Sequence, residues 1–589
     1  MTIISRSRWF GCRIWRLLTV RTFLIFTFTC IVFEITIGLP TYKRKKQVMI
    51  TSFFYFIRKM TKFAFLLTIA IQASISINFY HSNHSKFPGI VLPKQDNSFR
   101  FQRCSTENIL FEGSIKTYKK KRCYRLSKVH LNLVRILLEW EDTFPFNGIL
   151  ADNRNSDAYT VEEVHDLLKT AKSLKLEVIP LVPTFGHLEW ILKVERFRQY
   201  RQNDMFPQVI CLADNDGVSI VLEAIRQVVQ FHLPFGIKYF HIGADEAFQF
   251  GECLKDRQWL EANKGQEKDS LAAMHLAKVS NYVKTLIPNV RVLAWHDMIK
   301  SFESKLIDQY RLDQLLEIVV WDYSETLQQQ NDFTWHSLAA KFPVVWGSSA
   351  YKGANEPSSE FLDLEHYFRN NKAWITHRNI YGSLFRTFRG LIITGWQRYD
   401  HFAVLCELLP VGLPSAILNL LVAKAGDKFS TESIISATSA ALNCTSKISM
   451  EYMNSFDSCN FPGVELFTAI RSLRDYIKAI KNEVFESHQV KGWLSRFNVR
   501  HGYTQLWYLM ELENNIEMYT QEMLNMAKMI ESLMEPIFRR HTIDEWLYEY
   551  VDPTIERLME LSQQISQLKM RRTFTVRNFD IRRRMHYAL

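Results

Sequence analysis

Two adjacent carboxylates directly follow a short apolar run in this sequence. The segment Ile237–Phe248 reads IKYFHIGADEAF and carries Asp245 and Glu246 at its end, with Gly243 beside them. Acids at the end of a buried strand are costly to desolvate, so a fold keeps them there mainly for catalysis or for a tight ion pair. For one such pair taken alone, an acidic cap on the following helix is the alternative.

Other apolar runs of this sequence also finish in Trp, carboxylate, His or Tyr side chains. These runs are Val134–Trp140, Leu176–Pro183, Val290–Trp295, Glu317–Trp321, Phe342–Trp346 and Gly390–Trp396. Segments with helical periodicity, such as Val161–Leu174 and Ser219–Phe231, lie between them. Alternating strands and helices indicate a parallel sheet, and a β/α barrel builds its site from the C-terminal ends of its strands. We therefore predict an α/β fold of the (β/α)8 TIM type.

Aromatic side chains beside carboxylates suit a sugar, because its apolar C–H faces stack on indole rings while acids accept hydrogen bonds from its hydroxyl groups. Four tryptophans at the ends of the runs favour a pocket wall over simple packing, namely Trp295, Trp321, Trp346 and Trp396. An ordinary glycosidase places its two carboxyl groups on either side of the scissile bond. Neighbouring acids at a turn are compatible instead with substrate-assisted catalysis, in which a 2-acetamido oxygen is the nucleophile.

The segment His241–Glu246, HIGADE, resembles the His-x-Gly-x-Asp-Glu signature of the glycoside hydrolase family 20 β-N-acetylhexosaminidases. The segments LLEWEDTFPF, PLVPTFGHLEW, WHDMI, VVWDY and TGWQRYDHFAVLCELLP resemble its hexosaminidase D-like branch more than its lysosomal branch. The similarity extends from Lys128 to Pro414. It implies a retaining exo-hydrolase that removes terminal β-linked GlcNAc or GalNAc from glycoconjugates.

The resemblance also implies roles for individual residues. Glu246 would be the general acid/base, and Asp245 would orient the acetamido N–H and stabilise an oxazolinium intermediate. His241 would support this pair, and Tyr323 would bind the acetamido carbonyl. Further residues would line the pocket, contact sugar hydroxyls or support those that do: Trp396, Trp295, Trp321, Asp297, Glu139 and His187. No metal or organic cofactor is implied, and the Cys and His residues lack ligand spacings such as CxxC or HExxH.

The first β/α unit departs from the family pattern. Val129–Trp140 reads VHLNLVRILLEW, with no room for the helix that follows the first strand in the family. Parallel neighbours need a crossover of about a dozen residues or more. Either the barrel is open at this unit or the sequence comes from a gene model that lacks an exon. The alternative function is a catalytically inactive, membrane-anchored glycan-binding or scaffold protein.

The positive charge of the chain is local. The 589 residues carry a formal net charge of +12, but residues 1–62 hold twelve Lys or Arg and one Glu, which leaves only +1 for the rest. This distribution argues against a nucleic-acid partner. The basic clusters flank two apolar stretches, Thr22–Leu39 and Phe63–Tyr80, each near the minimum length for a membrane span.

Two topologies are open. A single anchor near residues 63–80 gives a single-pass type II membrane protein whose catalytic part faces the lumen of the Golgi or secretory pathway. Two spans would return it to the cytoplasm. The sequons at Asn83 and Asn443 favour the lumen and a glycoprotein. The nine cysteines show no disulfide framework in their spacing.

The predicted domains are a basic region with one or two spans at 1–80, a linker at 81–127, the catalytic barrel at 128–425 and a helical region at 426–589. In the last region, Leu466–Val484, Gln505–Glu531 and Thr542–Met570 have helical periodicity. This region would pack on the barrel or mediate oligomerisation, with the final helix pairing as a coiled coil in a homodimer.

Overall fold

The computed structural model describes residues 135–428, 430–574 and 576. The chain divides into two compact units, Met1–Arg103 and Cys104–Leu589, and every described residue belongs to the second. The predicted basic region, both predicted spans and the linker therefore lie outside the described residues. Within the described part, no helix combines the length and the apolar character that crossing a membrane requires.

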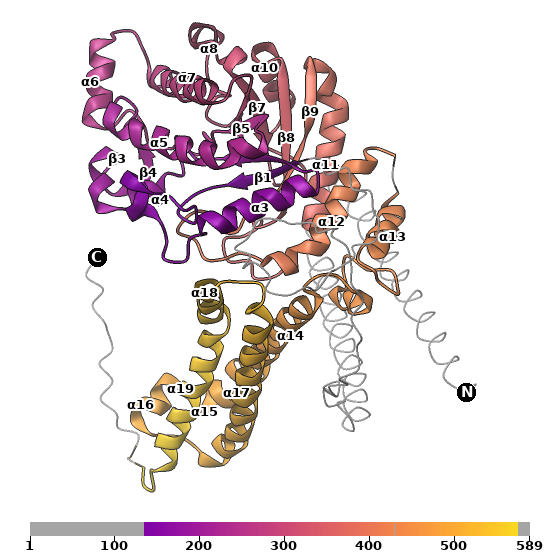
Figure 1. Ribbon diagram of the computed structural model, residues 1–589. Coiled ribbons are helices and arrows are strands. Elements are labelled where there is room, and N and C mark those ends of the chain that lie inside the picture. The colour runs from indigo at the N-terminus through magenta and orange to yellow at the C-terminus, as the bar shows by residue number, and fades with distance from the viewer. Residues whose placement is uncertain (1–134, 429, 575, 577–589) are drawn as a thin grey trace, which may run out of the picture. The chain divides into compact units, whose positions relative to one another are not determined.

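A parallel sheet of seven strands, paired in chain order, forms the framework of the molecule (Figure 1). The strands are β1 (Arg135–Glu139), β2 (Glu177–Leu181), β5 (Tyr239–His241), β6 (Arg291–Trp295), β7 (Leu316–Trp321), β8 (Val344–Lys352) and β9 (Thr387–Gly395). A separate antiparallel pair is formed by β3 (Arg201–Asn203) and β4 (Phe206–Ile210).

Helices connect the parallel strands, which confirms the prediction of a β/α barrel. They are α3 (Val161–Ser173), α4 (Glu189–Leu192), α5 (Asn215–His232), α6 (Leu254–Ala262), α7 (Lys268–Leu286), α8 (Ser304–Tyr310), α9 (Leu312–Leu315), α10 (Asp332–Lys341) and α11 (Leu364–Tyr381), and α12 (Leu409–Ala425) follows the last strand. Among the described residues β1 and β9 end the sheet and do not pair with each other. The barrel is thus nearly closed, and the segment predicted as its first strand lies outside the described residues.

Local sequence explains these elements. In α3, the Thr160 side chain accepts a hydrogen bond from the Glu163 amide while the Glu163 carboxylate accepts one from the Thr160 amide, so the first turn is capped at both groups. Along β6, Val292 and Ala294 face the core between sheet and helices. The alternate residue Trp295 packs inside the barrel.

The chain after the barrel is helical, and its two longest helices, α17 and α19, pack against each other (Figure 1). Its elements are α13 (Thr431–Ala441), α14 (Val464–Ile480), α15 (His488–Trp493), α16 (Arg496–His501), α17 (Leu506–Met534), α18 (Arg540–Tyr550) and α19 (Asp552–Lys569). The single helix predicted over Thr542–Met570 is wrong, because Pro553 in the first turn of α19 cannot continue α18.

Candidate active site

The turn that follows β5 holds its residues in an uncommon backbone conformation. Gly243, Ala244 and Glu246 all have positive φ, at 66°, 77° and 47°. A non-glycine residue in this region is strained, and such strain persists only where the surroundings fix it. Here the Trp295 amide donates to the Gly243 carbonyl at 2.9 Å. The short β5 strand therefore delivers Asp245 and Glu246 at a rigid corner.

A glycine in the loop after β2 allows that corner to be packed closely. A Cβ atom added to Gly186 would lie 2.1 Å from the backbone oxygen of Asp245. Only the absence of a side chain lets the two loops approach this far. The next residue, His187, thereby reaches the acidic pair.

One histidine nitrogen faces both carboxylates. The Nε2 atom of His187 lies 3.5 Å from Asp245 Oδ2 and 3.3 Å from Glu246 Oε2. Burial lowers the pKa of His187, but the negative charge of Asp245 and the hydrogen bond to Glu246 outweigh it and hold that pKa well above 6.5. Burial raises the pKa of Asp245 to about 7, against the lowering effect of His187. The imidazolium therefore balances two acids on the same side of the site.

Asp297 holds Glu246 and Trp321 in place through two hydrogen bonds. Its Oδ2 atom accepts the Glu246 amide at 2.9 Å, and its Oδ1 atom accepts the Trp321 indole N–H at 2.8 Å. Both carboxylate oxygens are thus engaged with the protein. Asp297 fixes the backbone of Glu246 and the plane of Trp321, and it does not line the cavity.

Aromatic rings form another part of the cavity wall. The Trp396 indole donates to the Tyr323 hydroxyl oxygen at 3.2 Å, so the phenolic hydrogen can be donated to another acceptor. Trp321 stacks on Tyr323 with ring centroids 5.4 Å apart, and Trp295 meets Trp396 edge to face at 6.2 Å. Burial, and to a smaller degree the charge of Asp245, raises the pKa of Tyr323, so this hydroxyl keeps its proton.

These groups surround one cavity of about 780 Å³ at the C-terminal ends of the strands. Eight of the ten predicted site residues line it: Glu139, His187, Asp245, Glu246, Trp295, Trp321, Tyr323 and Trp396. His241 does not, because it is fully buried, with its ring 4.4 Å from that of Trp295 and its Nδ1 atom accepting the Gly243 amide. Burial lowers the pKa of His241 to about 3, so it packs as a neutral ring.

Trp346 belongs to a different part of the barrel. We predicted that its strand ends there, but β8 continues to Lys352. Trp346 therefore packs in the interior core and donates its indole N–H to Glu317, which lies near the start of β7. The prediction that Trp346 forms part of the pocket wall is therefore wrong.

Comparison with known proteins agrees with this geometry. Residues 94–346 match the family described as glycosyl hydrolase family 20, catalytic domain. The chain is 31% identical to human hexosaminidase D over 445 residues, which is 74% of this chain and 88% of the relative. The chain belongs to glycosyl hydrolase family 20.

The chain is also 38% identical to bovine hexosaminidase D over 295 residues, which is 50% of this chain and 84% of the relative. A solved β-N-acetylhexosaminidase from Bacteroides fragilis aligns at 17% identity with a TM-score of 0.37, covering 49% of this chain and 59% of that one. The family and the two relatives place the chain in the hexosaminidase D-like branch, and it is a glycoside hydrolase.

The cavity is also lined by four charged residues that are not among the ten predicted site residues. His401 contacts Glu141 at 2.7 Å through Nδ1 and Asp142 at 3.4 Å through Nε2. Lys193 lies 2.6 Å from Asp142 and 2.9 Å from His401. All four line the cavity. The adjacent acids of the segment EWED are a signal for such a cluster, but their partners come from distant loops.

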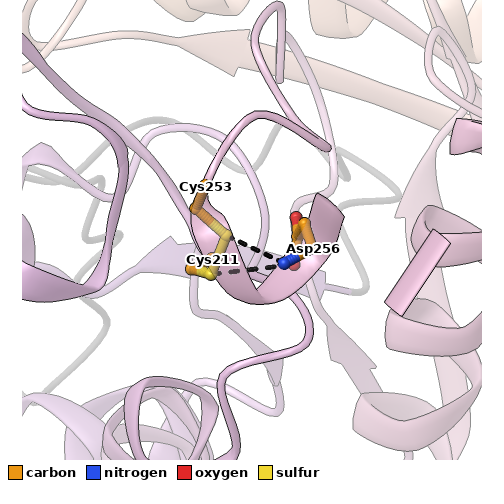
Figure 2. A group of neighbouring side chains, drawn as sticks. All are labelled: Cys211, Cys253 and Asp256. Atoms are coloured by element: carbon orange, nitrogen blue, oxygen red, sulfur yellow. Dashed lines mark hydrogen bonds between the residues drawn. A yellow bond between two sulfur atoms is a disulfide. The ribbon is translucent and has the colours of Figure 1, made fainter. Parts of the chain in front are cut away.

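A disulfide stands at the far end of the loop that carries the acidic pair. Cys253, at the start of α6, is bonded to Cys211, which follows β4 (Figure 2). Asp256 lies beside it and accepts hydrogen bonds from the Ala213 and Gly251 amides and from Gln202. These three residues are close enough to hold a metal ion. The bonded sulfurs offer no thiolates, however, and the carboxylate is engaged with its backbone donors.

A second disulfide joins Cys444 to Cys459. The spacing of the cysteines did not indicate either of these two pairs. The sequence separations of 42 and 15 do not by themselves specify partners, because the fold decides which thiols meet.

Proposed function

We propose that this enzyme is a retaining exo-β-N-acetylhexosaminidase that removes terminal β-linked GlcNAc or GalNAc by substrate-assisted catalysis. The observation that carries the proposal is the shared His187 nitrogen between Asp245 and Glu246. This contact sets the two acids side by side, so one reaches the leaving oxygen while the other reaches a neighbouring substituent. The names of the human and bovine relatives support the substrate class.

In the first step, Glu246 donates its proton to the glycosidic oxygen as the bond from that oxygen to C1 breaks. The acetamido carbonyl oxygen of the same sugar forms a new bond to C1 from the opposite face. Asp245 accepts the acetamido N–H and stabilises the positive charge of the oxazolinium that forms. Tyr323 donates to the acetamido oxygen and holds it near C1.

In the second step, the Glu246 carboxylate takes a proton from water as the water oxygen attacks C1. The bond from C1 to the acetamido oxygen breaks, and its electron pair restores the acetamido group. Two inversions at C1 give net retention. Trp295, Trp321 and Trp396 enclose the sugar and exclude other water. The carboxylates of Glu139, Glu141 and Asp142, which line the cavity, offer acceptors for its hydroxyl groups.

We also propose that the catalytic part works in the lumen of the secretory pathway. Two disulfides support this location, because disulfides persist in oxidising compartments. Asn443 is exposed and begins a glycosylation sequon, which agrees with that compartment. Anchoring by a type II span and homodimer formation stay predictions from the sequence.

The test is an assay of the full chain on 4-nitrophenyl β-glycosides of GlcNAc, GalNAc and glucose. The first two are hydrolysed and the glucoside is not, because it has no acetamido oxygen. A thiazoline mimic of the bicyclic intermediate inhibits strongly, since the site stabilises that state. A covalent glycosyl-enzyme trapped on a carboxylate, or comparable turnover of the glucoside, would show that the nucleophile belongs to the protein.

A further inference from the structure

Two adjacent asparagines occupy buried positions in the interior of α11. Asn370 and Asn371 are both fully buried, and each side chain makes three hydrogen bonds. Asparagine is a poor helix former, and a buried amide group without partners is costly. The two side chains therefore stabilise something other than the helix itself, and their partners show what each of them holds.

The side chain of Asn370 bonds to the backbone on both sides of Tyr323. Its Nδ2 atom donates to the Asp322 carbonyl at 2.9 Å and to the Ser324 carbonyl at 2.7 Å. Its Oδ1 atom accepts the amide of Ala350, in β8, at 3.3 Å. Both N–H bonds of the side chain are thus used. One planar group ties the segment that follows β7 to the neighbouring strand.

Other contacts make the same segment rigid. The Asp322 carbonyl also accepts the Trp374 indole N–H at 3.0 Å, again from α11. The buried Asp322 carboxylate accepts the Ser324 amide at 2.9 Å and the Ser324 hydroxyl at 2.7 Å. Tyr323 lines the cavity, whereas Asn370 and Trp374 do not. Asn370 can therefore act on a bound sugar only through the residue that it holds.

We infer that Asn370 is a positioning residue for the glycosidase reaction. By fixing the backbone that carries Tyr323, it sets the place of the hydroxyl that is directed at the acetamido oxygen. This inference rests on the proposed function. The Trp396 indole meets the same hydroxyl at 3.2 Å, so a shift of the backbone would move the Tyr323 ring away from both Trp396 and the sugar. A misplacement of about 1 Å at a reacting group can lower a rate by about 10²-fold.

Asn371 provides a matched control. Its Nδ2 atom donates to the Ala350 and Tyr367 carbonyls at 2.9 Å each, and its Oδ1 atom accepts the Ser349 hydroxyl at 2.6 Å. None of these partners lies in the segment around Tyr323. Leucine has nearly the shape of asparagine but forms no side-chain hydrogen bonds. Asn370→Leu and Asn371→Leu therefore each lose three hydrogen bonds, and we expect similar decreases in unfolding temperature.

Turnover of the 4-nitrophenyl β-glycoside of GlcNAc is measured on the full chain, below the unfolding temperature of every variant. Asn370→Leu lowers kcat by about 10- to 100-fold, whereas Asn371→Leu keeps it within about twofold of the parent. In the Tyr323→Phe background, Asn370→Leu lowers kcat by no more than about twofold, because the hydroxyl that it positions is already absent. Equal losses in the two asparagine variants, or a full further loss in the Tyr323→Phe background, would overturn the inference. If the leucine variants do not fold, Asn370→Ser and Asn371→Ser carry the same comparison with smaller side chains.

Crystal structures of the two variants separate this inference from the proposed function, because they do not depend on turnover. The Tyr323 hydroxyl leaves its contact with the Trp396 indole in Asn370→Leu and keeps that contact in Asn371→Leu. If the native chain hydrolyses the glucoside as fast as the GlcNAc glycoside while Tyr323 moves as expected, the proposed function fails and positioning by Asn370 stands. If Tyr323 stays in place in Asn370→Leu, positioning by Asn370 fails and the proposed function is untouched.

Discussion

The Nε2 atom of His187 lies 3.5 Å from the Oδ2 atom of Asp245. The two groups shift each other in opposite directions, because the carboxylate favours the imidazolium and the imidazolium favours the carboxylate. Burial of Asp245 works against its charged form and prevails, so its pKa stands at about 7. The ionisation of Asp245 therefore depends on His187.

This dependence predicts a shift in the pH profile. Turnover falls as the pH drops below about 7, because a protonated Asp245 cannot accept the acetamido N–H. His187→Gln removes the group that lowers the pKa of Asp245, so the acid limb of the kcat profile moves to higher pH. His336→Gln, at an exposed position in α10, leaves the limb in place. An unmoved limb in His187→Gln would show that another group controls it.

We expect Glu246→Gln to lower kcat by a factor that depends on the leaving group. Natural glycosides, whose leaving oxygen needs a proton, lose about 10²- to 10⁴-fold in kcat, the range that general acid catalysis supplies. Aryl glycosides with acidic leaving groups lose less in the first step. A series of aryl substrates of graded leaving-group pKa measures this. Equal losses across the series would remove Glu246 from the acid role.

We expect Gly186→Ala to displace the turn after β5 that carries Asp245 and Glu246. The added Cβ would meet the Asp245 backbone oxygen at 2.1 Å, so the loop must move. We expect a cost of about 1–3 kcal/mol in unfolding free energy and a lower kcat, measured by denaturant titration and by turnover. Gly492→Ala is the control, since nothing lies within 4 Å of its Cβ position in α15. Full activity in Gly186→Ala would show that the corner tolerates displacement.

We expect Cys253→Ser to lower both the free energy of unfolding and the activity. Closing a loop of 42 residues is worth about 4 kcal/mol in the chain-entropy account, and this bond anchors the end of the catalytic loop. Cys444→Ser, in the helical region, costs about 3 kcal/mol for its separation of 15 residues without lowering kcat. Unfolding curves and turnover at low temperature measure both effects. A Cys253→Ser variant with native kcat would make that bond purely stabilising.

Glycosylation of Asn443 tests whether the catalytic part of the chain lies in the lumen. Its side chain is exposed, so in the lumen it is glycosylated, and digestion with an N-glycosidase increases the mobility of the protein on a gel. Asn443→Gln removes that shift or one part of it, because Asn83 begins a second sequon. Protease added to sealed vesicles leaves the catalytic part intact. Its digestion there would favour the cytoplasm-facing topology.

The barrel and the inner end of the site could be predicted because their signals are local. Each of Glu139, Asp245, Trp295 and Trp321 stands at or just after a strand that its own neighbours specify. The contact between the loop after β9 and α18 could not be predicted, since Arg398 and Glu545 are 147 residues apart and no local pattern joins them. The split between α18 and α19 was predictable, because Pro553 marks it.

The distance in sequence between Arg398 and Glu545 has a consequence for biosynthesis. Chains emerge from the ribosome from the N-terminus, and domains fold as units while synthesis continues. The strands of the barrel, including the one that leads to Asp245 and Glu246, can therefore assemble before α18 exists. The loop after β9, which carries Arg398, meets Glu545 of α18 only when nearly the whole chain has been made. A nascent chain that stops after the barrel contains Asp245 and Glu246 but lacks the α18 side chains that line the cavity, so the cavity wall is the last part of this enzyme to be completed.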